Sequence, residues 1–187
     1  MTGSLDSFLD ELEAPAPSPC GGTAAALTGA MAAALVTMVA RGSANWADGP
    51  GIASQARSLR ARLVALGDED AAAFADVLST MREYQGTPEQ RDFALGNALL
   101  RAAEVPLRIA EAAADVTELA ALAAAEGAPQ LQADASAAAA LAEAATRAAT
   151  HLVDINLATV PGDRHSAHAA ELATAAATAR ARALEVA

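Results

Sequence analysis

Apolar residues recur along this chain at intervals of three and four, the spacing of one face of an α-helix. Turn-forming residues divide the pattern into segments, and no sustained alternation of apolar and polar residues predicts a strand. The pattern therefore predicts an all-α fold, a bundle of about five long helices. The expected helices span residues 4–12, 23–40, 52–84, 88–126 and 131–157, with a last helix from Asp163 or Ser166 to the C-terminus.

Residues 23–40 contain no charged residue and are apolar on every side. Such a helix must be buried on every side, so we expect this Ala-rich helix at the centre of the bundle. Its length approaches that of a membrane span, but its Ala, Gly and Thr content favours a core helix. This helix, with its small residues, and the apolar stripes of the other helices together present more apolar surface than one small bundle can cover. They predict a homodimer.

The stretch before this helix, residues 14–23, reads A-P-A-P-S-P-C-G-G-T. Alternate prolines hold the chain extended, and the two glycines are free to take backbone angles that other residues avoid. Free N–H groups at the start of the following helix make a candidate site for an anion or a carboxylate. The alternative is a stiff linker and a helix cap.

Two further local signals concern residues 88–126. Thr87, Pro88 and Gln90 form the sequence of a capping box, so we expect a helix to begin there. Pro106 lies inside this helix and predicts a kink, or a division into two segments, near Val105.

Length and charge limit the classes of function. The 187 residues suit a single domain, 1–187, and the net charge of −11, with no lysine, argues against nucleic acid or an acidic membrane as partner. Cys20 is the only cysteine, so no internal disulfide can form, and we expect a reducing cytoplasmic location. The N-terminal residues carry acidic groups, whereas a signal peptide would begin with a basic region.

Two carboxylates interrupt apolar stripes. Asp70 lies in the stripe of residues 59–81, and Asp134 lies near the start of the helix over 131–157. Burial raises the pKa of a carboxyl group toward the range useful for acid–base chemistry, and two such groups could converge in the core. The alternative for Asp134 is stabilisation by the helix dipole. The alternative for Asp70 is a buried ion pair with Arg41, Arg101 or Arg108.

Other candidate centres are weaker. His165, His168 and Glu171 have a spacing that a metal can use, but an exposed helix start is the simpler interpretation, and we expect no metal site. Cys20 has no histidine or asparagine visibly arranged to activate it, which favours a small buried thiol over a nucleophile. The chain has no phosphate-loop lysine, dinucleotide fingerprint or zinc-type cysteine spacing.

Several blocks of sequence, in order and over nearly the full length, resemble the formiminotransferase-cyclodeaminase / methenyltetrahydrofolate cyclohydrolase family. They are L-x-x-F-L-x-x-L at 5–12, P-x-P-x-G-G-T-x-A-A-L at 17–27, D-E-D-A-x-A-F at 68–74, E-V-P-L-x-I-A at 104–110, Asp134, and I-N-L at 155–157. The resemblance implies an all-helical, typically dimeric protein without a bound cofactor. Its substrate would be a tetrahydrofolate derivative: the family cyclises formimidoyl-tetrahydrofolate with loss of ammonia, or hydrolyses methenyl-tetrahydrofolate.

The resemblance also implies roles for individual residues. Asp70 would be the catalytic acid–base residue. The substrate-binding residues would be Gly21, Gly22 and Thr23, which line the folate pocket, with Asp134 and Asn156 near it.

The chain departs from the family pattern at four places. Cys20 replaces a glycine, Thr23 replaces a serine, residues 81–88 lack the usual lysine, and Leu152 replaces an asparagine. An alternative function therefore stays open, a non-catalytic helical dimer of the same fold that binds a small ligand or a protein partner. The choice between the cyclodeaminase and the cyclohydrolase reaction also stays open.

Overall fold

A computed structural model describes residues 5–14, 20–158 and 163–186 of this protein. These residues form six α-helices and one short 3-10 turn, and no strand occurs among them, so the all-α prediction is confirmed. The prolines of residues 15–19 lie outside the described residues. The helices are α1 (Leu5–Glu13), α2 (Gly21–Gly42), α3 (Gly49–Glu83), α4 (Pro88–Glu126), α5 (Gln132–Asn156) and α6 (Arg164–Glu185), with the 3-10 turn at Pro129–Leu131.

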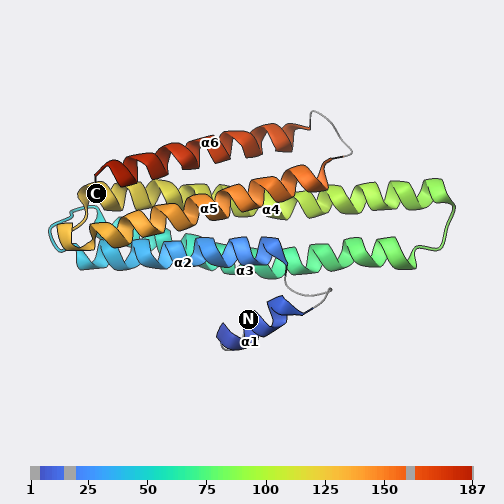
Figure 1. Ribbon diagram of the computed structural model, residues 1–187, viewed down its shortest axis with the longest axis horizontal. Helices are drawn as coiled ribbons and strands as arrows, with labels where there is room; N and C mark the ends of the chain where they lie inside the picture. The colour runs from blue at the N-terminus through green and yellow to red at the C-terminus, as the bar shows by residue number, and fades with distance from the viewer. Residues whose placement is uncertain (1–4, 15–19, 159–162, 187) are drawn as a thin grey trace.

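The five longer helices form an up-and-down bundle (Figure 1). Helix α4 packs against α2, α3, α5 and α6, and α2 packs against α3, α4 and α5. Helices α3 and α4 run on past the others and end in an exposed turn. The helices are long and the connections between α2 and α5 are short, so consecutive elements are neighbours in space.

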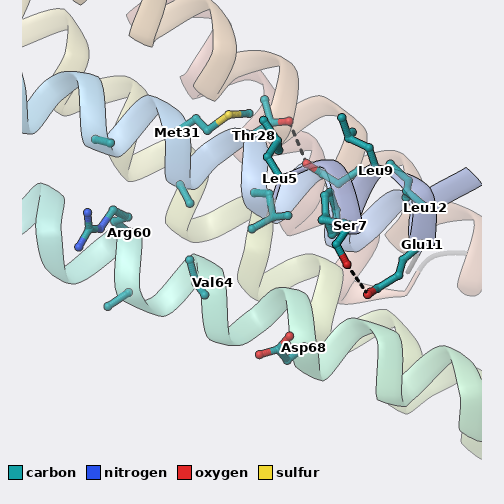
Figure 2. A pocket seen from close by; sticks show the side chains of 16 residues that line it. Leu5, Ser7, Leu9, Glu11, Leu12, Thr28, Met31, Arg60, Val64 and Asp68 are labelled. Carbon is teal, nitrogen blue, oxygen red and sulfur yellow. Dashed lines mark hydrogen bonds between the residues drawn. The ribbon is translucent and has the colours of Figure 1, made fainter. Parts of the chain in front are cut away.

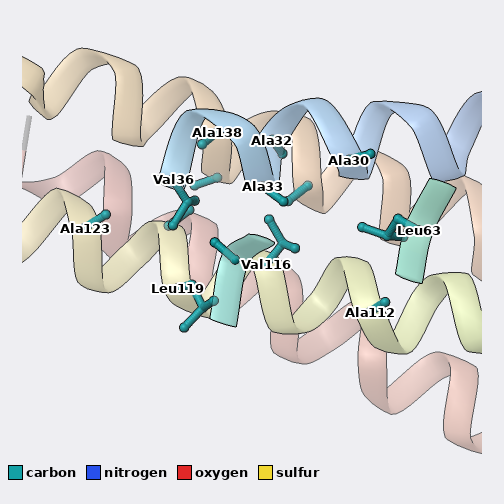
Figure 3. Packing of buried hydrophobic residues seen from close by; sticks show 14 of the residues in the cluster. Ala30, Ala32, Ala33, Val36, Leu63, Ala112, Val116, Leu119, Ala123 and Ala138 are labelled. Atoms are coloured by element: carbon teal, nitrogen blue, oxygen red, sulfur yellow. The ribbon is translucent and has the colours of Figure 1, made fainter. Parts of the chain in front are cut away.

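Alanine dominates the core. Figure 3 shows small side chains of α2, α4 and α5 facing one another around a few larger ones, among them Val36, Leu63 and Val116, none of which is exposed. Because alanine extends only one carbon beyond the backbone, neighbouring helices approach closely.

Helix α2 is enclosed on the sides that meet α3, α4 and α5, but it is not buried all round. Met31 is 55 % exposed and Met38 is 40 % exposed, and Ala34 is exposed between them. The expectation of burial on every side is therefore wrong for this face. By length and composition α2 is able to cross a membrane, with a mean hydropathy of 1.8, and 56 % of that stretch is buried inside the bundle.

The buried face of α5 also differs from the predicted one. The sequence predicts an apolar stripe through Ala138, Leu141, Ala145, Ala148, Leu152 and Ile155. Ala138 and Ala145 are buried as predicted, but Leu141, Ala148 and Ile155 are exposed, Ile155 by 55 %. Alanines and threonines such as Ala142 and Thr146 fill the buried face instead. The contact with α2 and α4 is too close for larger side chains, so the bulkier residues point outward.

Local signals set the ends of α4 and α6. The capping box of α4 is present: the Gln90 N–H donates to Thr87 Oγ1 at 3.3 Å, and the Thr87 N–H donates to Gln90 Oε1 at 3.1 Å. Asp163 caps α6 by accepting from the N–H of His165 at 2.7 Å.

Pro106 lies within one continuous helix, so the predicted division into two segments is wrong.

Helix α1 lies beside the bundle and has no buried residue (Figure 1). Its predicted apolar face is present and turns toward α2 and α3, where a pocket of about 1340 Å³ separates them (Figure 2). Leu5 is still 69 % exposed, and Met31 of α2 lies on the opposite wall. The apolar face of α1 is therefore only partly covered within one chain.

Replacing a core alanine by leucine tests the close packing of α5. Ala138 has no exposed surface, so Ala138→Leu should lower the free energy of unfolding by about 1–3 kcal/mol or more, because the added atoms have no space. The neighbouring Ala137 is exposed, and Ala137→Leu should change it by less than about 0.5 kcal/mol. Urea unfolding of both variants makes the comparison. Equal stabilities would contradict the packing described.

Candidate functional site

Asp70 of α3 places its carboxylate against the first turn of α2. The side chain is 6 % exposed, as its place in the apolar stripe predicts. A Cβ atom added to Gly22 would lie 2.3 Å from Asp70 Oδ1 and 2.4 Å from both Cγ and Oδ2. Only glycine leaves room for the carboxylate at this point, so Gly22 and Asp70 are mutually dependent.

Two residues of the loop and first turn, Cys20 and Thr23, hold this junction. The thiol of Cys20 donates to Asp70 Oδ2 across 3.1 Å, and the backbone N–H of Thr23 also stabilises the carboxylate. The Thr23 hydroxyl donates to the carbonyl of Gly67, one turn before Asp70, at 3.0 Å. The carboxylate that lies at the start of this helix is therefore that of Asp70, a residue of the same chain.

Burial controls the ionisation of this pair. Desolvation raises the pKa of Asp70 above its ordinary value of 3.8, and the bonds from Cys20 and Thr23 oppose that rise. Burial, together with the hydrogen bond and the negative charge of Asp70, raises the pKa of Cys20 to about 11. Cys20 therefore keeps its proton near neutral pH, which is unsuitable for a nucleophile and suitable for a donor.

No arginine among the described residues forms an ion pair with Asp70. Arg101 pairs with Asp76 at 3.0 Å, and Arg108 pairs with Glu69 at 2.5 Å, both on the surface. The alternative of a buried ion pair at Asp70 is therefore wrong. A buried carboxyl group without a cation, held by two weak-to-moderate donors, is able both to accept and to release a proton.

The end of α5 forms another wall near this junction. Leu152 Cδ1 lies 4.0 Å from the position of a Cβ on Gly21, so the residue that replaces the family's asparagine is an apolar neighbour of the loop. Asn156 is one helical turn further along the same face. The structure thus brings Gly21, Gly22, Thr23 and Asp70 together, and Asn156 lies one turn beyond Leu152 on α5.

Asn156 also has a structural task. Proline has no N–H, so Pro106 leaves the carbonyl of Ala102 without its usual partner four residues along α4. The side-chain amide of Asn156 donates to this carbonyl at 3.0 Å. The bond links the end of α5 to α4 and explains how Pro106 fits inside a continuous, buried helix.

Asp134 does not join this site within one chain. It lies in the first turn of α5, close to Leu131, whose Cδ1 is 2.5 Å from the position of a Cβ on Gly42 at the far end of α2. The 22 residues of α2 span about 30 Å, so Asp134 and Asp70 are at opposite ends of that helix. The expectation that the two carboxylates converge is wrong, and a place in the first turn of a helix, where the dipole stabilises a carboxylate, agrees with the alternative.

The remaining candidates are also separate from Asp70. The His165 ring pairs with Asp163 at 2.5 Å, and His168 lies 3.5 Å from Glu111 and 3.7 Å from Glu171. In the described part of the chain, no three His, Cys, Asp or Glu side chains are grouped to hold a metal ion. The large pocket beneath α1 does not include Asp70 in its lining either.

Sequence reasoning missed the partnership of Cys20 with Asp70. The two residues are 50 positions apart, and only the packing of α2 on α3 brings them together. The available signal was the position of Cys20 directly before the Gly-Gly-Thr segment that the resemblance connects with Asp70.

Comparisons with known proteins agree on one family. The family model described as Formiminotransferase-cyclodeaminase matches residues 4–178. The chain is 33 % identical over 163 residues to the methenyltetrahydrofolate cyclohydrolase of Methylorubrum extorquens, covering 82 % of this chain and 78 % of that protein. It is 36 % identical over 121 residues to the formimidoyltransferase-cyclodeaminase of Rattus norvegicus, covering 59 % of this chain but 22 % of that protein. The crystal structure of formiminotetrahydrofolate cyclodeaminase from Thermotoga maritima matches with a TM-score of 0.85 at 26 % identity, covering 99 % and 96 % of the two chains.

A methyl group at Gly22 should displace Asp70. Gly96→Ala, at a helical glycine with nothing within 4 Å, should stabilise the protein by about 0.5–1 kcal/mol through helix propensity. Gly22→Ala should forgo that gain and lower the melting temperature, because the carboxylate must move. A Gly22→Ala protein as stable as Gly96→Ala would contradict the described contact.

The raised pKa of Asp70 predicts a pH-dependent effect of Asp70→Asn. Ionisation of Asp70 costs stability, because burial disfavours its charged form in the folded protein. This cost is absent below pH 3.8, the ordinary pKa of the group in the unfolded chain, and it is complete above the raised pKa in the folded protein. The melting temperature of Asp70→Asn relative to the wild type should therefore rise as the pH increases above about 4, and it should end level with or above that of the wild type once Asp70 is ionised. The other carboxylates titrate in both proteins, so their effects cancel in the difference between the two melting temperatures. A constant difference, or a large loss at pH 7, would refute this.

Proposed function

Because the chain belongs to the formiminotransferase-cyclodeaminase family, we propose that it is a folate one-carbon enzyme, either a formimidoyltetrahydrofolate cyclodeaminase or a methenyltetrahydrofolate cyclohydrolase. One observation above all supports the proposal. The carboxyl group of Asp70 is 6 % exposed and lacks an arginine partner within the described residues, in a family whose named members carry out reactions that require proton transfer.

In the cyclodeaminase reaction, N10 of the folate attacks the carbon of the protonated formimidoyl group, whose nitrogen thereby becomes an amino group. Asp70 takes the proton from N10 and delivers it to the amino group, which leaves as ammonia when its bond to carbon breaks. The product is the methenyl bridge between N5 and N10. One carboxyl group with a raised pKa suffices, because the proton that it receives is the proton that it gives.

In the cyclohydrolase reaction, Asp70 takes a proton from the water that attacks the methenyl carbon. The bond from that carbon to N5 then breaks, N5 receives the proton from Asp70, and the hydroxyl proton goes to solvent as the formyl group forms. The same residue serves as base and then as acid in both reactions. The relatives carry one name or the other, so both reactions belong to the proposal.

The substrate-binding part of the proposal concerns the residues beside Asp70. Gly21 is exposed at the start of α2, so the folate can approach the backbone there without meeting a side chain. Thr23 and Asn156 use their hydrogen bonds to fix α2 against α3 and α5 against α4, so both shape the surroundings of Asp70. Asp134 can contribute only from a second copy, since within one chain it lies at the far end of α2.

Specific observations favour the alternative, a non-catalytic binding protein of the same fold. Leu152 gives the neighbourhood of Gly21 an apolar wall, and the exposed turn over residues 84–87 has no lysine. Loss of an amide and a cation removes two groups able to hold a polar substrate. Binding of a folate without turnover would support this alternative.

The absorbance of methenyl-tetrahydrofolate tests the proposed function. Purified protein should either produce this absorbance from formimidoyl-tetrahydrofolate with release of ammonia, or accelerate its loss from methenyl-tetrahydrofolate beyond the uncatalysed rate. Gly22→Ala should abolish the activity while Gly96→Ala keeps it, because only the first displaces Asp70. If the wild type changes neither rate, the enzymatic assignment fails, and equilibrium dialysis with tetrahydrofolate then tests the binding alternative.

We also propose that the chain works as a homodimer. The exposed face of α2 with Met31, Ala34 and Met38 and the partly covered face of α1 leave apolar surface uncovered on neighbouring helices. A stable interface needs roughly 800 Å² from each partner, so we expect both faces to take part.

Light scattering at micromolar concentration should give twice the mass of one chain. Met38→Glu, which puts a charge on the exposed face of α2, should shift the protein toward monomer, whereas Ala137→Glu on the exposed side of α5 should not. A wild-type monomer would disprove the dimer. Equal effects of the two substitutions would place the interface elsewhere.

A further inference from the structure

We propose that Cys20 is a positioning residue for Asp70. The reduced thiol of Cys20 holds oxygen Oδ2 of the Asp70 carboxylate at the first turn of α2 during proton transfer. The proposal rests on the proposed function, because it gives Asp70 a supporting donor in that reaction. Cys20 itself does not touch the reacting atoms.

The geometry identifies the thiol as the donor. Cys20 occupies the position just before α2, and its sulfur lies 3.1 Å from Asp70 Oδ2. A carboxylate offers only acceptors, so the hydrogen between these atoms belongs to sulfur. A thiol with a pKa of about 11 keeps that hydrogen through the neutral range.

A second donor matters for this carboxylate because its terminal torsion is broad. The carboxylate of an aspartate rotates easily about the bond to Cβ unless neighbours fix it. Gly22 leaves space for the group and Thr23 contributes a backbone N–H, so neither prevents rotation alone. The Cys20 thiol adds a second donor, and its hydrogen bond favours the ionised form of Asp70.

The pH dependence of the folate reaction measures this role. In Cys20→Ala the limb of the kcat/KM profile that reports Asp70 should move to higher pH, by an amount equivalent to a roughly two- to tenfold change in its ionised fraction. Cys20→Ser keeps a donor, so the limb of its profile should lie close to that of the wild type. Thr37→Ala, which removes a hydroxyl that bonds only to the Ala33 carbonyl of its own helix at 2.8 Å, should leave the profile unchanged.

Alkylation of the thiol gives a readout that does not need folate turnover. Cys20 is the only cysteine, so the mass gained from iodoacetamide reports this residue alone. Asp70→Asn removes the charge that opposes thiolate formation, and alkylation at about pH 9 should accelerate several-fold. Gly96→Ala, with nothing near the glycine, should keep the wild-type rate.

The two arms separate the possible failures. Equal alkylation of the wild type and Asp70→Asn would overturn the contact, whatever the folate assay shows. Faster alkylation of Asp70→Asn in a protein without folate turnover would reject the proposed function, and with it a role for Cys20 in the reaction. An unchanged pH profile in Cys20→Ala, with turnover intact, would overturn the positioning role alone. If Cys20→Ala does not fold, the pH profile of Cys20→Ser is compared with that of another replacement that lacks a donor. A smaller shift of the limb in Cys20→Ser supports the positioning role, and equal shifts overturn it.

Discussion

The close contact between the Asp70 carboxylate and the first turn of α2 constrains the rest of this structure. Glycine at position 22 leaves room for the carboxylate, the Cys20 thiol donates to it, and the Thr23 hydroxyl donates to the carbonyl of Gly67, so α2 and α3 have one register at that end. A buried carboxylate costs free energy unless donors surround it, and here the start of a helix supplies them. The junction therefore combines a structural cost with a chemical capacity, since the same burial raises the pKa of Asp70.

The alanine core makes so short a contact possible. Residues such as Ala26 and Ala33 of α2 have no exposed surface, and small side chains on α4 and α5 face them. Larger side chains would separate the helices and withdraw Asp70 from the turn of α2. The same close packing at α5 is secured near its end by Asn156, which occupies the carbonyl that Pro106 leaves free. Packing and site are thus parts of one arrangement.

Local signals in the sequence predict the helices well, and long-range contacts only in part. The capping box at Thr87 and the charge-free run of α2 depend on neighbouring residues, and both appear where expected. The burial of Asp70 follows from its place in a stripe of larger apolar residues. The stripe of α5 failed because an alanine-rich helix looks apolar on most sides, so periodicity does not decide between Leu141 and Ala142. The separation of Asp134 from Asp70, and the meeting of Cys20 with Asp70, depend on which helix ends lie together, which no local pattern encodes.

The most direct test of the central claim is the folate turnover of Asp70→Asn, measured beside its melting temperature. Asparagine keeps the shape and a hydrogen-bonding head group but cannot transfer the proton. If Asp70 is the acid–base residue, kcat/KM should fall by roughly a hundredfold or more while the melting temperature at neutral pH stays level or rises. Turnover close to that of the wild type, or a loss of activity that only follows a large loss of stability, would contradict the account.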